Sequence, residues 1–116
     1  MANSDTDTRP LVKISVQGGT KLAALYDTRA AVTVISEEAF LNIPRKDQPL
    51  RLEGEPTRIT GIVKKPLCIR GCYGVTFKIQ GRVIKHDTLV VSGLCVDAII
   101  GCDIINRYHL SYDASK

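Results

Sequence analysis

Leu25-Tyr26-Asp27-Thr28-Arg29-Ala30 is the stretch of sequence on which the fold assignment depends. It places the carboxylate of Asp27 directly after an apolar run and shortly before a second apolar run, Val32–Ile35. An ionised aspartate between two buried strands is costly unless it is hydrogen-bonded or functional. Aspartate is also common in ordinary turns, so this stretch taken alone favours a simple turn residue.

The segment before Asp27 predicts a β-hairpin. Leu11–Gln17 alternates apolar and polar residues, which is typical of a half-buried strand. Gly18-Gly19 can turn the chain because glycine accepts positive φ, and Leu22–Tyr26 then returns as a second strand. The carboxylate of Asp27 therefore stands at the end of the second strand of a hairpin.

The segment after Asp27 predicts a short helix and more strands. Ser36 can cap a helix whose first turn carries Glu37 and Glu38, and this helix should end near Ile43-Pro44. The polar residues 45–56 indicate a loop with short extended pieces. Further extended segments are expected at residues 59–63, 67–70, 75–79, 83–91 and 109–112, with a second short helix at 103–108.

Two of the expected strands resemble each other in sequence. Val12–Gly18 and Val75–Gly81 each begin a hairpin that is followed by an apolar segment and a short helix. Two related halves would give an all-β domain with internal pseudo-twofold symmetry. Chance similarity between two amphipathic strands explains the resemblance equally well.

Length and charge limit the choice of fold and partner. The 116 residues suffice for one compact domain, which we place at residues 10–116, after a polar, disordered lead-in at residues 1–9. The net charge of +4 comes from 16 Lys and Arg against 12 Asp and Glu. The basic residues are scattered, and no run of aromatic and arginine residues occurs, so a solvated surface is favoured over nucleic-acid binding.

The cysteines do not indicate a metal site. Cys68, Cys72, Cys95 and Cys102 include no C-x-x-C pair, and there are two histidines. We expect no metal and no cofactor, and we interpret the cysteines as small, reduced, buried residues. No signal peptide or membrane-spanning stretch is evident, so an intracellular or virion-associated location without membrane contact is expected.

Together with its neighbours, Asp27 lies in a pattern that resembles the retropepsin-like aspartic proteases of retroviruses and LTR retrotransposons. That family opens with a strand, a glycine turn, a strand, Asp-Thr-Gly-Ala, a strand and a helix. The matching residues are Asp27, Thr28, Ala30, Thr33, Val34 and Ile35. A second signature of two apolar residues, glycine, a variable residue and Asp or Asn is matched by Ile99, Ile100, Gly101, Cys102 and Asp103. The resemblance covers roughly residues 10–113.

The resemblance implies an all-β fold: a closed acid-protease barrel with one or two short helices and its active site at a homodimer axis. Each subunit would contribute Asp27, and the two carboxylates would share a proton while activating water against a peptide or polyprotein. Thr28 would brace the two active-site turns across the axis. A flap would close over the peptide, and it is placed at Ile59, Thr60, Gly61 and Ile62.

Arg29 departs from the family pattern, because it stands where the family has glycine. Its guanidinium could favour two ionised aspartates or enter the cleft, unless the side chain points away from the axis. Cys102 and a flap with a single glycine are smaller departures. Two main hypotheses follow: an active homodimeric endopeptidase, or an inactive dimerising or peptide-binding domain. A third, a small nucleic-acid-binding barrel, lacks stacking aromatics on its strands.

Overall fold

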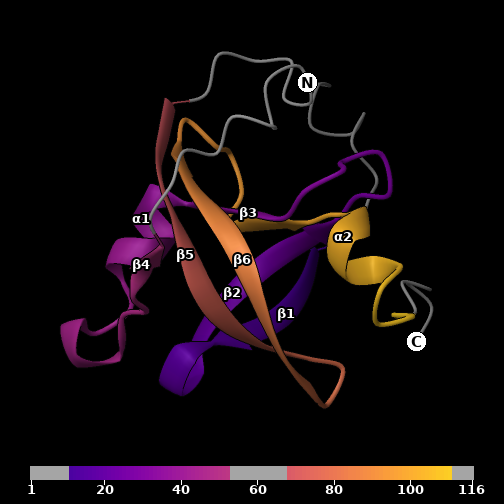
Figure 1. Ribbon diagram of the computed structural model, residues 1–116, viewed down its shortest axis with the longest axis horizontal. Coiled ribbons are helices and arrows are strands. Elements are labelled where there is room, and N and C mark those ends of the chain that lie inside the picture. The colour runs from indigo at the N-terminus through magenta and orange to yellow at the C-terminus, as the bar shows by residue number, and fades with distance from the viewer. Residues whose placement is uncertain (1–10, 53–67, 111–116) are drawn as a thin grey trace.

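The computed structural model describes residues 11–52 and 68–110, in which one β-sheet closes on itself (Figure 1). The strand order is β1-β2-β7-β3-β6-β5-β4, and β1 also pairs with β5, so all but β4 form a closed barrel. The strands are β1 (Leu11–Val16), β2 (Thr20–Tyr26), β3 (Val34–Ser36), β4 (Arg51–Leu52), β5 (Cys68–Ile79), β6 (Arg82–Ser92) and β7 (Ala98–Ile100). The helical elements are α1 (Glu37–Leu41), α2 (Cys102–Ile105) and the 3-10 turns η2 (Gln17–Gly19) and η3 (Arg45–Asp47). The expected mostly-β barrel with two short helices is confirmed.

Two antiparallel hairpins build most of the barrel. The first joins β1 to β2 through η2, and the second joins β5 to β6. The second hairpin is longer than its sequence pattern indicated, because the runs expected at 67–70 and 75–79 are parts of one strand, β5. A bulge between Ile69 and Gly71 shifts the register within that strand, and such a bulge bends a long strand around a barrel.

The two hairpins are related by an internal pseudo-twofold pattern of strand pairing. The second strand of each hairpin pairs in parallel with the short strand that follows the other hairpin, β2 with β7 and β6 with β3. Gln17 and Gln80, which occupy equivalent positions at the hairpin turns, both have positive φ, 40° and 53°. Shared pairing and shared turn conformation favour related halves over chance similarity.

The core is mainly aliphatic, as the composition indicated. Phe77, Ile35 and Ile100 are fully buried, together with most inward residues of the barrel strands. A second, smaller cluster contains Val34, Leu89 and Val91, against which partly buried residues pack; these are Val32, Cys72, Leu94 and Ile99. Because this apolar cluster includes residues of β3 and β7, it adjoins the loop that carries Asp27.

The two helices begin as their sequences indicate. Ser36 caps α1, with its hydroxyl oxygen accepting a hydrogen bond from the N–H of Ala39 at 3.0 Å, and Glu37 and Glu38 lie in the first turn. α2 begins after Gly101 and ends at Ile105, earlier than expected. His109 lies in a turn with φ of 53°, so the strand expected from residue 109 does not begin there.

The interpretation of the cysteines as buried residues is wrong. Cys68 and Cys95 are exposed, whereas Cys72 and Cys102 are partly buried, and all four are free thiols. Cys68 begins β5, Cys95 lies between β6 and β7, and Cys102 begins α2, whereas Cys72 lies within β5 and packs against the smaller apolar cluster. Among residues 11–52 and 68–110, no helix has the length and apolar character required to cross a membrane.

Candidate functional site

Asp27 lies at the carboxyl end of two parallel strands. It follows Tyr26, the last residue of β2, which is in register with Ile100 of β7. The N–H of Asp27 donates to the carbonyl of Ile100 at 3.0 Å, so the parallel ladder continues one residue beyond the strand. The N–H of Ala30 then donates to the carbonyl of Asp27 at 3.1 Å and closes a turn. Residues 27–30 are the candidate active-site turn, called the active-site turn below, and these hydrogen bonds fix its backbone.

Cys102 connects the active-site turn to the second signature. Its N–H donates to the carbonyl of Ala30 at 2.8 Å, and its thiol donates to the carbonyl of Thr28 at 2.8 Å. A Cβ atom on Gly101 would lie 2.7 Å from the carbonyl oxygens of Ala30 and Val32. Only glycine fits at position 101, because real Cβ atoms do not approach backbone atoms so closely. The two signatures are thus in direct contact.

Asp103 anchors the loop that follows the active-site turn. Its Oδ2 accepts the N–H of Thr33 at 2.9 Å, and its Oδ1 accepts the hydroxyl of Thr33 at 2.6 Å. The same Thr33 hydroxyl oxygen accepts the N–H of Gly101 at 3.0 Å. Thr33 is fully buried, so these groups have no access to water that could replace a lost partner. The loop is therefore held to α2 by a closed hydrogen-bond network.

His86 of β6 is a site residue that sequence reasoning missed. Its Nε2 lies 3.0 Å from Oδ2 of Asp103, and both side chains are largely buried. Burial would raise the pKa of Asp103, but hydrogen bonds from His86 and Thr33 outweigh it, so this pKa lies below its usual value. No sequence pattern indicated this contact, because 17 residues separate the partners and a single histidine forms no motif.

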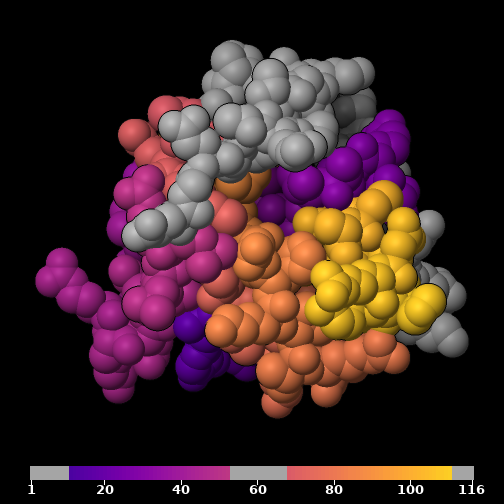
Figure 2. All heavy atoms as spheres, viewed as in Figure 1, coloured from indigo at the N-terminus to yellow at the C-terminus, as the bar shows by residue number. Residues whose placement is uncertain are grey.

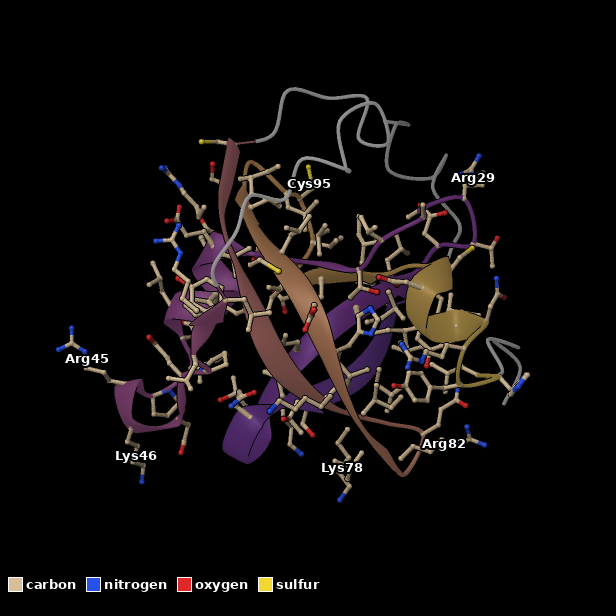
Figure 3. All side chains as sticks on the ribbon, viewed as in Figure 1. Arg29, Arg45, Lys46, Lys78, Arg82 and Cys95 are labelled. Carbon is tan, nitrogen blue, oxygen red and sulfur yellow. The ribbon has the colours of Figure 1, made fainter. Side chains whose placement is uncertain are left out.

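Arg29 contacts the carboxylate of Asp27 with both its backbone and its side chain. The Arg29 N–H donates to Oδ1 of Asp27 at 2.9 Å, while the side-chain Nε lies 3.8 Å from the same oxygen. The Arg29 side chain is 80% exposed, against 18% for Asp27, and it projects outward from the molecule (Figure 3). The guanidinium is therefore within ion-pair range of the carboxylate but strongly hydrated, which weakens their attraction.

An apolar surface lies beside the active-site turn. Val32 follows the turn, Ile99 precedes Gly101, and both pack against the small cluster of Val34, Leu89 and Val91. Val32 and Ile99 are only partly buried, so they leave apolar surface close to Asp27. Such a surface suits an apolar side chain of a bound peptide.

The remaining predicted site residues are placed as follows. Thr28 is exposed on the turn. The expected flap residues Ile59, Thr60, Gly61 and Ile62 lie outside the described residues. Within the described ranges, no three acidic, histidine or cysteine side chains are grouped to hold a metal ion.

A shallow cavity of about 530 Å³ is separate from this site. It lies where β1 and η2 meet β5 and β6, and its lining includes Lys21, Phe77 and Lys78. Lys78 and Arg29 lie at opposite ends of the molecule (Figure 3). The space-filling view shows α2 and residues 106–110 beside β6 (Figure 2), and contacts from Arg82 to Tyr108 and from His86 to Asp103 join them.

Comparisons with known proteins indicate the retroviral type of protease, both from sequence and from structure. The family described as retroviral aspartyl protease matches residues 6–111. The structure of EIAV protease in complex with the inhibitor HBY-793 is similar, with 25% identity, a TM-score of 0.67, and coverage of 90% of this chain and 92% of that chain. The retroviral protease-like domain of Ddi1 from Leishmania major shares the fold, with 16% identity, a TM-score of 0.69, and coverage of 94% and 84%. No curated protein sequence matches the chain.

Proposed function

Because the chain belongs to the retroviral aspartyl protease family, we propose that it is an aspartic endopeptidase that acts as a homodimer with one Asp27 from each subunit. One observation carries the proposal. The active-site turn is bonded directly to the second signature, through Asp27 to Ile100 and through Thr28 and Ala30 to Cys102. A turn fixed at both ends can present its carboxylate in one defined position, which catalysis by positioned groups requires.

The dimer supplies what a single subunit lacks. One subunit brings one catalytic carboxylate, whereas general acid and base catalysis on a peptide bond needs two groups in opposite protonation states. Two Asp27 carboxylates at a twofold axis share one proton, because like charges at short range do not both ionise. The ionised carboxylate removes a proton from water, while the protonated one polarises the scissile carbonyl. Thr28, exposed on the turn, faces the second subunit in this arrangement.

The substrate is a peptide segment with apolar side chains, such as a cleavage site in a polyprotein. The support is the apolar surface that Val32 and Ile99 form beside the turn. Burying one such side chain of a substrate contributes roughly 1.5–3 kcal/mol. We also propose that the protein is located inside the cell or in a virus particle.

A second candidate function is a dimerising, peptide-binding domain without protease activity. The specific observation that favours it is the guanidinium of Arg29, 3.8 Å from Oδ1 of Asp27. Two such cations at a dimer axis would stabilise two ionised carboxylates and remove the shared proton. The 80% exposure of Arg29 argues against a complete loss, because solvent screens most of this interaction.

The test of the proposal is hydrolysis of a library of apolar peptides by the wild type and by Asp27→Asn. The amide cannot act as the base, so we expect Asp27→Asn to have no activity and an unchanged circular dichroism spectrum. Asp47→Asn is a suitable control, because Asp47 lies on η3, away from the turn. Cleavage by Asp27→Asn at the wild-type rate would reject Asp27 as the catalytic residue.

Subunit mixing tests the shared active site. Folded Asp27→Asn protein is added to a fixed amount of wild type, and the rate of hydrolysis is followed. If subunits exchange and a mixed dimer is inactive, an equimolar mixture should retain roughly half of the activity per wild-type subunit. Asp47→Asn protein should not lower the rate. An undiminished rate with excess Asp27→Asn, under conditions of proven exchange, would contradict the homodimeric site.

A further inference from the structure

The most distinctive polar group outside the two signatures is the imidazole of His86. It is largely buried on β6, and its Nε2 lies 3.0 Å from Oδ2 of Asp103. Asp103 is the charged partner that the structure records for this imidazole among the described residues; Val75, its cross-strand neighbour on β5, is apolar. His86 therefore directs its ring at the carboxylate that anchors the loop after the active-site turn.

The contacts from His86 to the active-site turn are continuous. Both oxygens of Asp103 bind Thr33, and the hydroxyl oxygen of Thr33 accepts the N–H of Gly101. Gly101 packs against the carbonyl oxygens of Ala30 and Val32 at the limit of close approach. Cys102, the next residue, binds the carbonyls of Thr28 and Ala30. Each step is a hydrogen bond or a backbone contact with little room for adjustment.

We propose that His86 is a positioning residue for the active site: by donating from Nε2 to Asp103, it fixes the carboxylate that holds Thr33 and Gly101, and through them the turn that carries Asp27. This inference rests on the proposed protease function. In this arrangement Asp103 accepts three hydrogen bonds, and the one from His86 is a third constraint that holds the carboxylate plane in the orientation that Thr33 needs. A rotated carboxylate would lose its two-point contact with Thr33, and the loop would shift relative to the second signature.

The kinetic test compares His86→Leu, which has no donor, with His86→Gln, whose side-chain amide keeps an N–H at a similar distance from the backbone. A small displacement of the catalytic group lowers kcat more than substrate binding, so we expect His86→Leu to lower kcat roughly 10-fold to 100-fold. KM should change by less than about threefold, and His86→Gln should recover most of the rate. A loss of rate that His86→Gln fails to recover would overturn the proposal.

The sequence offers a matched control, because it contains two histidines. His109 is exposed and lies in the turn after α2. His109→Leu and His109→Gln should leave kcat and KM unchanged. If the His109 variants lost as much kcat as the His86 variants, the effect would be a general one on stability and the proposal would fail.

A second measurement does not depend on activity and keeps this inference separate from the proposed function. Nuclear magnetic resonance of the wild-type protein should show the His86 ring proton on Nε2. In the His86→Leu spectrum the amide resonances of Thr33, Gly101 and Ala30 should be shifted from their wild-type positions, and in the His86→Gln spectrum they should return to them. If the wild type cleaved no peptide, the protease function would be rejected, and the resonance measurement alone would decide whether His86 positions the turn. An unprotonated Nε2 in the wild type, which needs no variant to fold, would overturn the role of His86.

Discussion

Thr33 and Asp103 are joined at two points, by the threonine N–H to Oδ2 at 2.9 Å and by the hydroxyl to Oδ1 at 2.6 Å. They are 70 residues apart in sequence and belong to the two separate signatures of the chain. This contact converts two short sequence motifs into one rigid unit. Substitution of Asp103, which has no proposed catalytic role, can therefore be used to measure how much this contact stabilises the loop.

Asp103→Ala should destabilise the protein by roughly 1–3 kcal/mol, because it leaves the buried N–H and hydroxyl of Thr33 without their acceptor. Asp103→Asn should cost less, since its amide oxygen can still accept one of the two bonds. Urea denaturation followed by circular dichroism gives both values. The control is Asp87→Ala, which removes an exposed carboxylate from β6 and should change the free energy of unfolding by less than about 0.5 kcal/mol. Equal losses for Asp87→Ala and Asp103→Ala would contradict this role.

Acid should remove the stabilisation that Asp103 provides. Burial opposes ionisation of Asp103, but hydrogen bonds from His86 and Thr33 lower its folded-state pKa below the ordinary value of 3.8. A depressed folded pKa gives stability that is present above the unfolded pKa and is lost as pH falls through the folded pKa. The advantage of the wild type over Asp103→Asn in free energy of unfolding should therefore be constant near neutral pH. It should shrink as pH falls below about 4.

Urea titrations of both proteins at several pH values would check this. Other carboxylates also titrate in that range, so the quantity to follow is the difference between the two proteins and not the stability of either one. A difference that grows on acidification would show that the carboxylate of Asp103 is destabilised in the fold.

Gly101→Ala should disrupt the active-site turn. The added Cβ would lie 2.7 Å from carbonyl oxygens of Ala30 and Val32, and backbone atoms held in hydrogen bonds cannot move aside cheaply. We expect a loss of about 1–3 kcal/mol in stability and a larger proportional loss of activity. Gly74→Ala is the matched control, because its Cβ would meet only the side-chain Cε of Lys85 at 3.6 Å, an ordinary contact. Similar melting temperatures for both variants would show that the turn adapts.

The sequence predicted the local features of this fold better than its long-range contacts. Ser36 caps α1, and the residues of β1 alternate between more buried and more exposed positions, because capping and alternation depend on neighbours in the chain. The two signatures also indicated segments that the fold brings into contact, the turn at residues 27–30 and the residues around Gly101. The contact between His86 and Asp103, and the thiol of Cys102 on the carbonyl of Thr28, depend on how separate strands are brought together. The cysteines were misjudged for the same reason, since exposure is decided by packing.

Arg29→Gly should raise activity if the cation impairs the site. The change removes the guanidinium 3.8 Å from Oδ1 of Asp27 and keeps the backbone N–H that binds the same oxygen. Because Arg29 is 80% exposed, its attraction for the carboxylate is screened, and we expect kcat/KM at mildly acidic pH to rise only about two- to fivefold. The affinity for an inhibitor that carries a hydroxyl in place of the scissile carbonyl, and so mimics the transition state, should increase by a similar factor.

Two variants separate charge from other effects of that substitution. Arg29→Lys keeps a cation near Asp27 and should behave as the wild type, whereas Arg45→Gly removes an exposed arginine from η3, far from the turn, and should change neither rate nor affinity (Figure 3). The measurements are steady-state hydrolysis of an apolar peptide and calorimetric titration with the inhibitor. If Arg29→Gly matched the wild type in both, Arg29 would be a tolerated surface residue, and a low activity of the proposed protease would have another cause. If Arg29→Gly alone were active, the wild-type chain would be a binding domain that its own arginine keeps silent.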